Sequence, residues 1–259
     1  MNETRKGGLR LANENPWYLL ATLYGEILDH PSGIECEANR QLHARNRVAW
    51  NRWMVTSLDA TARSSLKKHR DYIDGEFDPF SDEELKEQWE LIGNRGLSKR
   101  FYKDIDLQSD RDLAIEFGAT KFEEKCDLRG FYFPRRTSFD GSVFVSDADF
   151  TETIFDDYVH FESCHFQGPV NFYSATFNKW TLFRNSKFLR YANFGYATFS
   201  DGAMFDGFSI QGHADFNHAH YCGFCALPWR RILRPSNLLR RKFWICCFSE
   251  SRFCRRCRL

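Results

Sequence analysis

Two pairs of cysteines near the C-terminus have the spacing of metal ligands. They are Cys222-Gly-Phe-Cys225 and Cys254-Arg-Arg-Cys257, with 28 residues between the pairs. Four thiolates from two such pairs can hold zinc in a tetrahedral site. The usual interval is shorter, roughly 15–20 residues, and basic neighbours favour separate thiolates that oxidise easily. We therefore predict free thiols in this region, and no metal or other cofactor.

A column of short polar side chains recurs at a constant interval, at Asp127, Asp149, Asn171, Asn193 and Asp215. Asp and Asn side chains bond the backbone of a turn, which predicts a structural ladder. The competing interpretation is an acidic stripe that imitates DNA phosphates. The histidines of the repeat scatter over different sides and do not predict a catalytic or metal site; they are His160, His165, His213, His218 and His220. Two cysteines, Cys126 and Cys164, fall at small inward positions and are expected to fill the core.

The sequence contains no motif of an enzyme. It has no GxGxxG fingerprint, no Gly-Lys-Ser/Thr phosphate loop and no Gly-x-Ser-x-Gly elbow. We expect a protein without catalytic or cofactor-binding residues.

The element that must position these side chains is a repeat from Phe117 to Tyr221. Large apolar residues follow one another in steps that alternate between five and six, so the pattern has a period of 22. This spacing matches neither a helix period of 3.6 nor a strand period of 2. It predicts a coil with four sides, whose turns stack about 4.8 Å apart. The phenylalanines of the four columns, which we predict to form the core, are Phe117, Phe139, Phe161, Phe183 and Phe205; Phe122, Phe144, Phe166 and Phe188; Phe150, Phe172, Phe194 and Phe216; and Phe133, Phe155, Phe177 and Phe199.

Smaller residues lie two positions before each large one, and seventeen of these twenty are Ala, Ser, Thr, Cys or Val. Residues two apart share one face of an extended segment, so both series point inward. Glycine lies two positions after the large residue at 130, 141, 168, 207, 212 and 223, where we expect corners with positive φ.

Segments such as Ala148-Asp149-Phe150, Ala192-Asn193-Phe194 and Ala214-Asp215-Phe216 resemble the A-(D/N)-(L/F)-x-x unit of pentapeptide-repeat proteins. The alternating step is similar to a Phe-rich subgroup that is common in bacteria. The resemblance covers about 105 of the 259 residues. It implies a right-handed quadrilateral β-helix, about five coils long.

The chain divides into four predicted regions. Residues 1–15 are polar and expected to be disordered, and residues 16–104 are expected to be helical. Residues 105–225 form the β-helix, and residues 226–259 form a basic, Cys-rich tail. The helical region has two competing roles, a cap for the open end of the β-helix or a separate binding unit.

Charge is balanced over the whole chain, with 36 Lys/Arg against 35 Asp/Glu. It is uneven along it: residues 222–259 carry ten basic residues and one acidic residue, hence +9. No secretory signal and no run of about 18 apolar residues is present. Nine cysteines without an extracellular sign favour a reducing cytoplasm.

Four functions compete. The first is a scaffold that binds an unknown protein partner, or a second copy in a homodimer, through an outward apolar patch of Val143, Val145, Leu189, Ile154 and Tyr132. The resemblance implies the second, a DNA mimic that binds type II topoisomerase (gyrase). The third is weak binding of nucleic acid or an anionic membrane through the basic tail. The fourth, an enzyme in the helical region, has no supporting residue.

Overall fold

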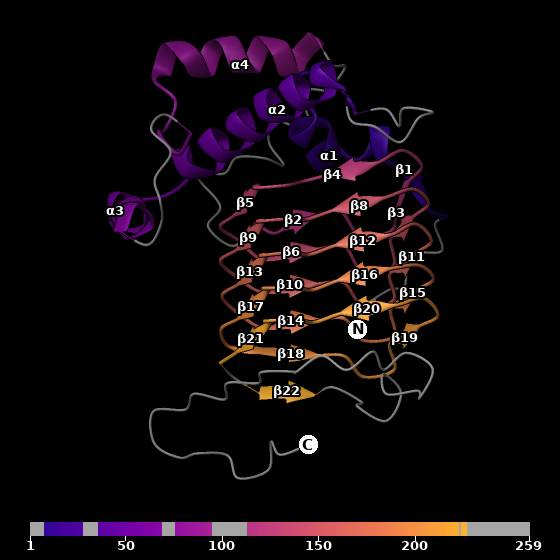
Figure 1. Cartoon of the computed structure of the whole chain (residues 1–259). Coiled ribbons are helices and arrows are strands. Elements are labelled where there is room, and N and C mark those ends of the chain that lie inside the picture. Colours follow the sequence, from indigo (N-terminus) through magenta and orange to yellow (C-terminus); the bar gives the residue numbers. More distant parts are fainter. Residues whose placement is uncertain (1–7, 28–35, 69–75, 95–112, 223, 227–259) are drawn as a thin grey trace, which may run out of the picture.

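The computed structural model describes residues 8–27, 36–68, 76–94, 113–222 and 224–226. Short parallel strands stack into the four sides of a β-solenoid, and helices cover its N-terminal end (Figure 1). The predicted architecture is therefore confirmed: about five coils, each one period of the sequence pattern, with helices before them. The β-helix begins at Ile115 and its last described strand ends at Ala226.

Each side of the solenoid is one parallel sheet. From β2 onward, strands four elements apart in sequence are neighbours, and β1 pairs with β3. Within the coil, partners in adjacent turns are one period apart in sequence, as Val159 is from Thr137 and Thr181. Sheet A contains β1 (Arg10–Leu11), β3 (Thr120–Phe122), β7 (Val143–Phe144), β11 (His165–Phe166), β15 (Lys187–Phe188) and β19 (Ser209–Ile210). Sheet B contains β2 (Ile115–Glu116), β6 (Thr137–Ser138), β10 (Val159–His160), β14 (Thr181–Leu182), β18 (Gly202–Met204) and β22 (Phe224–Ala226). Sheet C contains β4 (Cys126–Asp127), β8 (Ala148–Asp149), β12 (Val170–Asn171), β16 (Ala192–Asn193) and β20 (Ala214–Asp215). Sheet D contains β5 (Tyr132–Phe133), β9 (Ile154–Phe155), β13 (Thr176–Phe177), β17 (Thr198–Phe199) and β21 (His220–Tyr221).

The core consists of the phenylalanine columns. All seventeen repeat phenylalanines are buried, and of the twenty large positions only Ile210 is partly exposed. Successive rings in a column lie nearly parallel, as between Phe139 and Phe161, whose centroids are 4.8 Å apart. Rings from neighbouring columns meet edge to face, as Phe150 and Phe161 do. Both arrangements are favourable for aromatic quadrupoles, so one residue type can fill the interior.

Left-handed corners recur twice in each coil, at a regular interval rather than at every glycine. Ten residues from Ala119 to His218 have positive φ at this interval, and only Gly130, Gly141 and Gly207 of them are glycines. The prediction is wrong for Gly168 and Gly212, which do not have positive φ, and Gly223 lies outside the described residues. A Cβ at Gly168 or Gly212 would collide with the carbonyl oxygen of Ser146 or Arg190 in the adjacent coil, so these glycines permit close backbone approach instead.

The helical region contains a 3-10 turn, η1 (Ala12–Glu14), and four helices: α1 (Pro16–Ala21), α2 (Glu37–Thr56), α3 (Ala60–Lys68) and α4 (Asp82–Asn94). A capping box begins α4, because the side chains of Ser81 and Glu84 each accept a bond from the other's backbone N–H. Figure 1 shows α1 and α2 lying across the first coil, with α4 outside α2.

Strand β1 corrects the expectation of a disordered N-terminus. Arg10 and Leu11 pair in parallel with β3, and Asn15 caps α1 while its Nδ2 donates to Thr120 Oγ1 at 2.8 Å. Residues 1–15 are mostly polar, so the sequence pattern does not indicate a strand there. The strand forms because the open edge of sheet A offers unpaired backbone groups that Arg10 and Leu11 can bond. Residues 1–7 and the predicted tail 227–259 lie outside the described residues.

Candidate functional site

The polar column on sheet C forms the predicted structural ladder. All five side chains accept, through Oδ1, a hydrogen bond from the backbone N–H two residues further on, at 2.9–3.3 Å. Strand pairing places them directly above one another in adjacent coils. Each side chain therefore fixes its own corner, and two of the five, Asn171 and Asn193, carry no charge.

The first member of the column is attached to the helical region. Asp127 is buried, and its carboxylate lies 2.6 Å from Arg129 Nη2, 3.3 Å from Lys125 Nζ and 3.3 Å from His43 Nε2 of α2. Burial alone would raise the pKa of Asp127. The Arg129 hydrogen bond and the charges of His43, Lys125 and Arg129 outweigh it, so the pKa lies below its usual value. Asp149 has weaker partners, and burial raises its pKa.

Exposed aromatic side chains flank this ladder in the corners on either side of sheet C. Tyr191 directly precedes β16, and Tyr173 and Tyr196 follow β12 and β16. Tyr173, Tyr191 and Tyr196 are 39%, 40% and 46% exposed. The Tyr173 and Tyr196 centroids are 5.3 Å apart; Tyr196 stacks on His218 at 4.7 Å and Tyr191 on His213 at 5.8 Å. We call these five residues the tyrosine surface. It was not predicted from the sequence, although positions 191 and 213, like 196 and 218, are one period apart, which is the signal for such stacks.

The apolar patch predicted from the sequence is not present as a whole. Val145 is 38% exposed and Val143 and Leu189 are half-buried, but Ile154 and Tyr132 are each 2% exposed. Tyr132 packs against Phe77 of the helical region, and its hydroxyl donates to Asp156. Its neighbour Ile154 lies between Tyr132 and Thr176 in sheet D. The helical region thus covers Tyr132, and the predicted patch is reduced to Val143, Val145 and Leu189.

The remaining candidates for chemistry stay apart. His160 lies 3.6 Å from Asp140 on sheet B, and this carboxylate raises its pKa. Cys126 and Cys164 are buried in the core as expected. Among the described residues, no three His, Cys, Asp or Glu side chains are grouped to hold a metal ion. Cys222 is exposed, and the side chains of the other three cysteines of the two pairs, Cys225, Cys254 and Cys257, lie outside the described residues.

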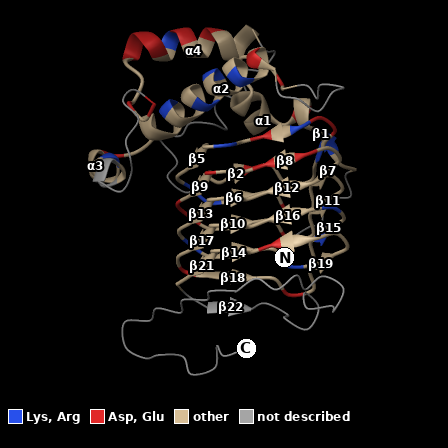
Figure 2. Ribbon diagram, in the orientation of Figure 1, with Lys and Arg blue, Asp and Glu red and all other residues tan. Residues whose placement is uncertain are grey.

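Most charged residues of the coil lie between its strands rather than in them. Figure 2 shows strands that are mostly uncharged, whereas acidic residues gather on α4, whose first turn holds Asp82, Glu83 and Glu84. None of the described helices has the length and apolarity needed to cross a bilayer.

The family model of pentapeptide repeats (nine copies) matches residues 128–176 and 161–209. These are coils whose inward phenylalanines and small residues are described above. Residues 128–209 are pentapeptide repeats. No curated protein and no solved structure matches the chain. The pentapeptide repeats supply a scaffold, and its outward side chains lie on the surfaces of an extended solenoid.

Proposed function

We propose that this protein is a non-enzymatic cytoplasmic scaffold that binds a protein partner through the tyrosine surface. The supporting observation is two groups of exposed rings that flank sheet C, in which Tyr196 stacks on His218 and Tyr191 stacks on His213. Tyrosine is enriched in the energetic centres of protein interfaces. Rings that are already stacked on a rigid sheet lose little conformational freedom on binding. Buried free thiols at Cys126 and Cys164 support a reducing compartment.

The test is partner retention by surface variants. Full-length protein and the double variant Tyr191→Ser/Tyr196→Ser are immobilised and exposed to native lysate, and retained proteins are identified by mass spectrometry. Tyr158→Ser is the matched control, because Tyr158 is 45% exposed but lies just before β10 of sheet B. We expect the double variant to lose at least about tenfold of a retained protein that the control keeps. Equal retention by all three proteins would contradict the proposal.

A homodimer is the alternative occupant of the same surface. Sedimentation at increasing protein concentration distinguishes it, because self-association through the tyrosine surface would disappear in the double variant. Binding of nucleic acid or anionic membrane by residues 226–259 is a separate proposal, which a variant ending at Gly223 tests.

The DNA-mimic alternative finds little support in the polar column. Its Oδ1 atoms are engaged by backbone N–H groups, and two neutral amides interrupt it. We therefore expect no inhibition of DNA gyrase supercoiling at micromolar protein. Inhibition that is lost on replacing Asp149 and Asp215 would instead favour the mimic.

A further inference from the structure

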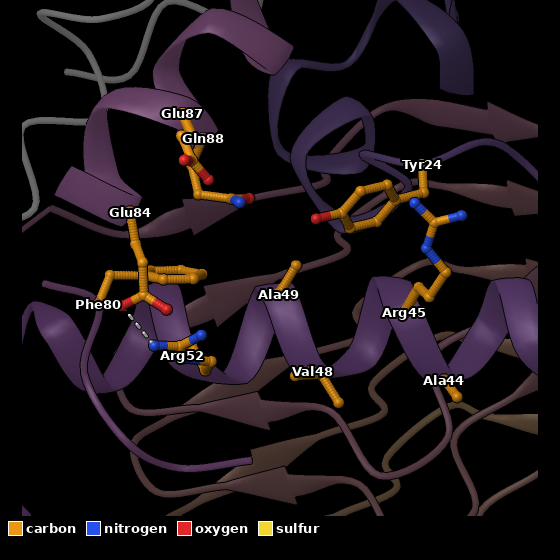
Figure 3. Close-up of a pocket in the computed structure, with 10 residues that line it drawn as sticks. All are labelled: Tyr24, Ala44, Arg45, Val48, Ala49, Arg52, Phe80, Glu84, Glu87 and Gln88. Atoms are coloured by element: carbon orange, nitrogen blue, oxygen red, sulfur yellow. Dashed lines mark hydrogen bonds and ion pairs between the residues drawn. The ribbon is translucent and has the colours of Figure 1, made fainter. Parts of the chain in front are cut away.

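The helical region contains a cavity that neither the capping role nor the tyrosine surface uses. It lies between α2, α4 and the end of α1, and its volume is about 360 Å³. Small-molecule sites are commonly concave and mostly apolar, with a few converging polar groups. Here Ala44, Val48, Ala49 and Phe80 supply the apolar lining. Figure 3 shows Ala49 between Tyr24 and Arg45 on one side and Glu87 and Gln88 on the other.

One end of this cavity offers hydrogen-bond donors and positive charge. The Arg45 guanidinium lies 4.3 Å from the centroid of the Tyr24 ring, and no carboxylate of the described residues pairs with it. Asn46 fixes this end, since its Oδ1 accepts from the Tyr24 N–H at 2.9 Å and its Nδ2 donates to the Gly25 carbonyl. A stacked and positioned guanidinium is suited to a carboxylate.

The other end offers acceptors and negative charge. Gln88 of α4 is 8% exposed, and its buried Oε1 has no hydrogen-bond partner among the described residues. Such an atom normally finds a partner, so it points to a donor that the chain does not supply. Glu87 lines the same end, whereas Glu84 is paired with Arg52 at 2.8 Å. The charges left for a ligand are therefore one cation and one anion.

We propose that this cavity binds a short zwitterionic peptide of dipeptide size. Its carboxylate would contact Arg45 and the Tyr24 hydroxyl, and its amino group would donate to Gln88 Oε1 and Glu87. The floor of the cavity from Arg45 to Arg52 is about 10 Å long at the helical rise. Two extended residues span about 7 Å, whereas the amino and carboxyl groups of a free amino acid share one carbon and cannot reach both ends.

The test is calorimetric titration of the full-length protein with Ala-Leu, Leu-Ala, Ala-Phe and Phe-Ala at millimolar concentration. We expect at least one to bind, and roughly tenfold weaker binding after its carboxylate is amidated or its amino group is acetylated. Free leucine is expected not to bind.

Arg45→Gln and Glu87→Gln test the two ends separately, and both sites are exposed enough for the fold to be kept. Each is expected to weaken binding roughly tenfold, and Arg40→Gln, on the same helix but outside the cavity, to leave it unchanged. Gln88→Met removes the unpartnered oxygen and is expected to weaken binding roughly tenfold without lowering the melting temperature. Failure of all four dipeptides, or unchanged binding by Arg45→Gln, overturns the proposal. Neither result bears on the tyrosine surface.

Discussion

The coil and its helical cap pair equivalent backbone groups of the strands in different ways. Inside the coil each strand pairs with its equivalent one period away, and the Ile154 N–H donates to the Phe131 carbonyl of the turn before. At the first turn no earlier copy exists. There Asn51 accepts from the Tyr132 N–H at 2.8 Å, and its Nδ2 donates to the Gly130 carbonyl at 3.1 Å. One side chain thus makes the hydrogen bonds that a preceding strand would otherwise supply at this position.

The cap closes every side of the solenoid with a different device. Strand β1 adds to sheet A, Asn15 donates to the Glu116 carbonyl of sheet B, and His43 approaches Asp127 of sheet C. At sheet D, Trp50 is fully buried and donates from Nε1 to the Tyr132 carbonyl at 2.8 Å. Repetition makes coil positions interchangeable, whereas each cap contact is used once. Variants of the two regions should therefore behave differently.

Deletions in the coil should separate repeat units from arbitrary lengths. Removing residues 150–171 takes out one turn and places Phe172 where Phe150 was, so every column is preserved. Removing residues 150–154 replaces a five-residue step by a six-residue step and misplaces all later corners. We expect the first protein to melt cooperatively at a somewhat lower temperature and the second not to fold, as followed by circular dichroism. Similar melting of both would refute the equivalence of the turns.

Truncating a buried ring in the cap and one in the coil should lower the free energy of unfolding by similar amounts but expose different residues to hydrogen exchange. Phe161→Ala and Trp50→Ala each remove a fully buried ring and should lower the free energy of unfolding by about 3–5 kcal/mol. In a solenoid each turn contacts only its neighbours, so loss of Trp50 should release mainly the first turn. Hydrogen exchange should show fast amides in residues 115–133 for Trp50→Ala, and fast amides in the turns that hold Phe139, Phe161 and Phe183 for Phe161→Ala. Uniform exchange in both variants would contradict this division.

Position 51 should require an asparagine, because its side chain must both donate and accept a hydrogen bond. Asn51→Ala leaves the Tyr132 N–H and the Gly130 carbonyl without their partner, at a cost of about 1–3 kcal/mol. Asn51→Asp keeps the acceptor but loses the donor, and the nearby Glu76 adds repulsion, since Asn51 Nδ2 also lies 3.4 Å from Glu76 Oε1. Chemical denaturation measures both. Asn178→Ala is the control. Asn178 directly follows β13 of sheet D, and its side chain bonds the outward Asp156 and Ser200, so the loss should cost under about 1 kcal/mol.

Two members of one column should respond to pH in opposite directions. Asp127 has a lowered pKa, so its charge stabilises the fold above its unfolded pKa of about 3.9, and this contribution is lost as pH falls through the folded value. Asp127→Asn should therefore cost about 1–3 kcal/mol at neutral pH and progressively less in acid.

Asp149 has a raised pKa, so its charge opposes folding at neutral pH and the opposition disappears in acid. Asp149→Asn should raise stability by about 0.5–1 kcal/mol at neutral pH, because an amide makes the same backbone bond at Asn171 and Asn193. Thermal melts between pH 3 and pH 7 measure both variants. A stability change of the same sign in both variants at neutral pH would contradict the difference between Asp127, which contacts the cap, and Asp149 in the next turn.

The solenoid could be predicted from the sequence because its contacts are periodic. An inward Phe such as Phe161 meets the same residue type one period before and one period after it, so spacing alone specifies its surroundings. The polar ladder was predictable for the same reason, since Asx corners are local and bond only two residues ahead.

The cap and the binding surfaces depended on tertiary structure. Nothing periodic indicates that Asn51 bonds Tyr132, that Arg10 extends sheet A, or that Ile154 lies buried. The cavity forms where Arg45 and Gln88, which belong to two separate helices, line the same space. The sequence determined the columns because each repeats its own neighbours. Only the folded chain decided which outward residues stay exposed, because a cap contact occurs once and leaves no period to read.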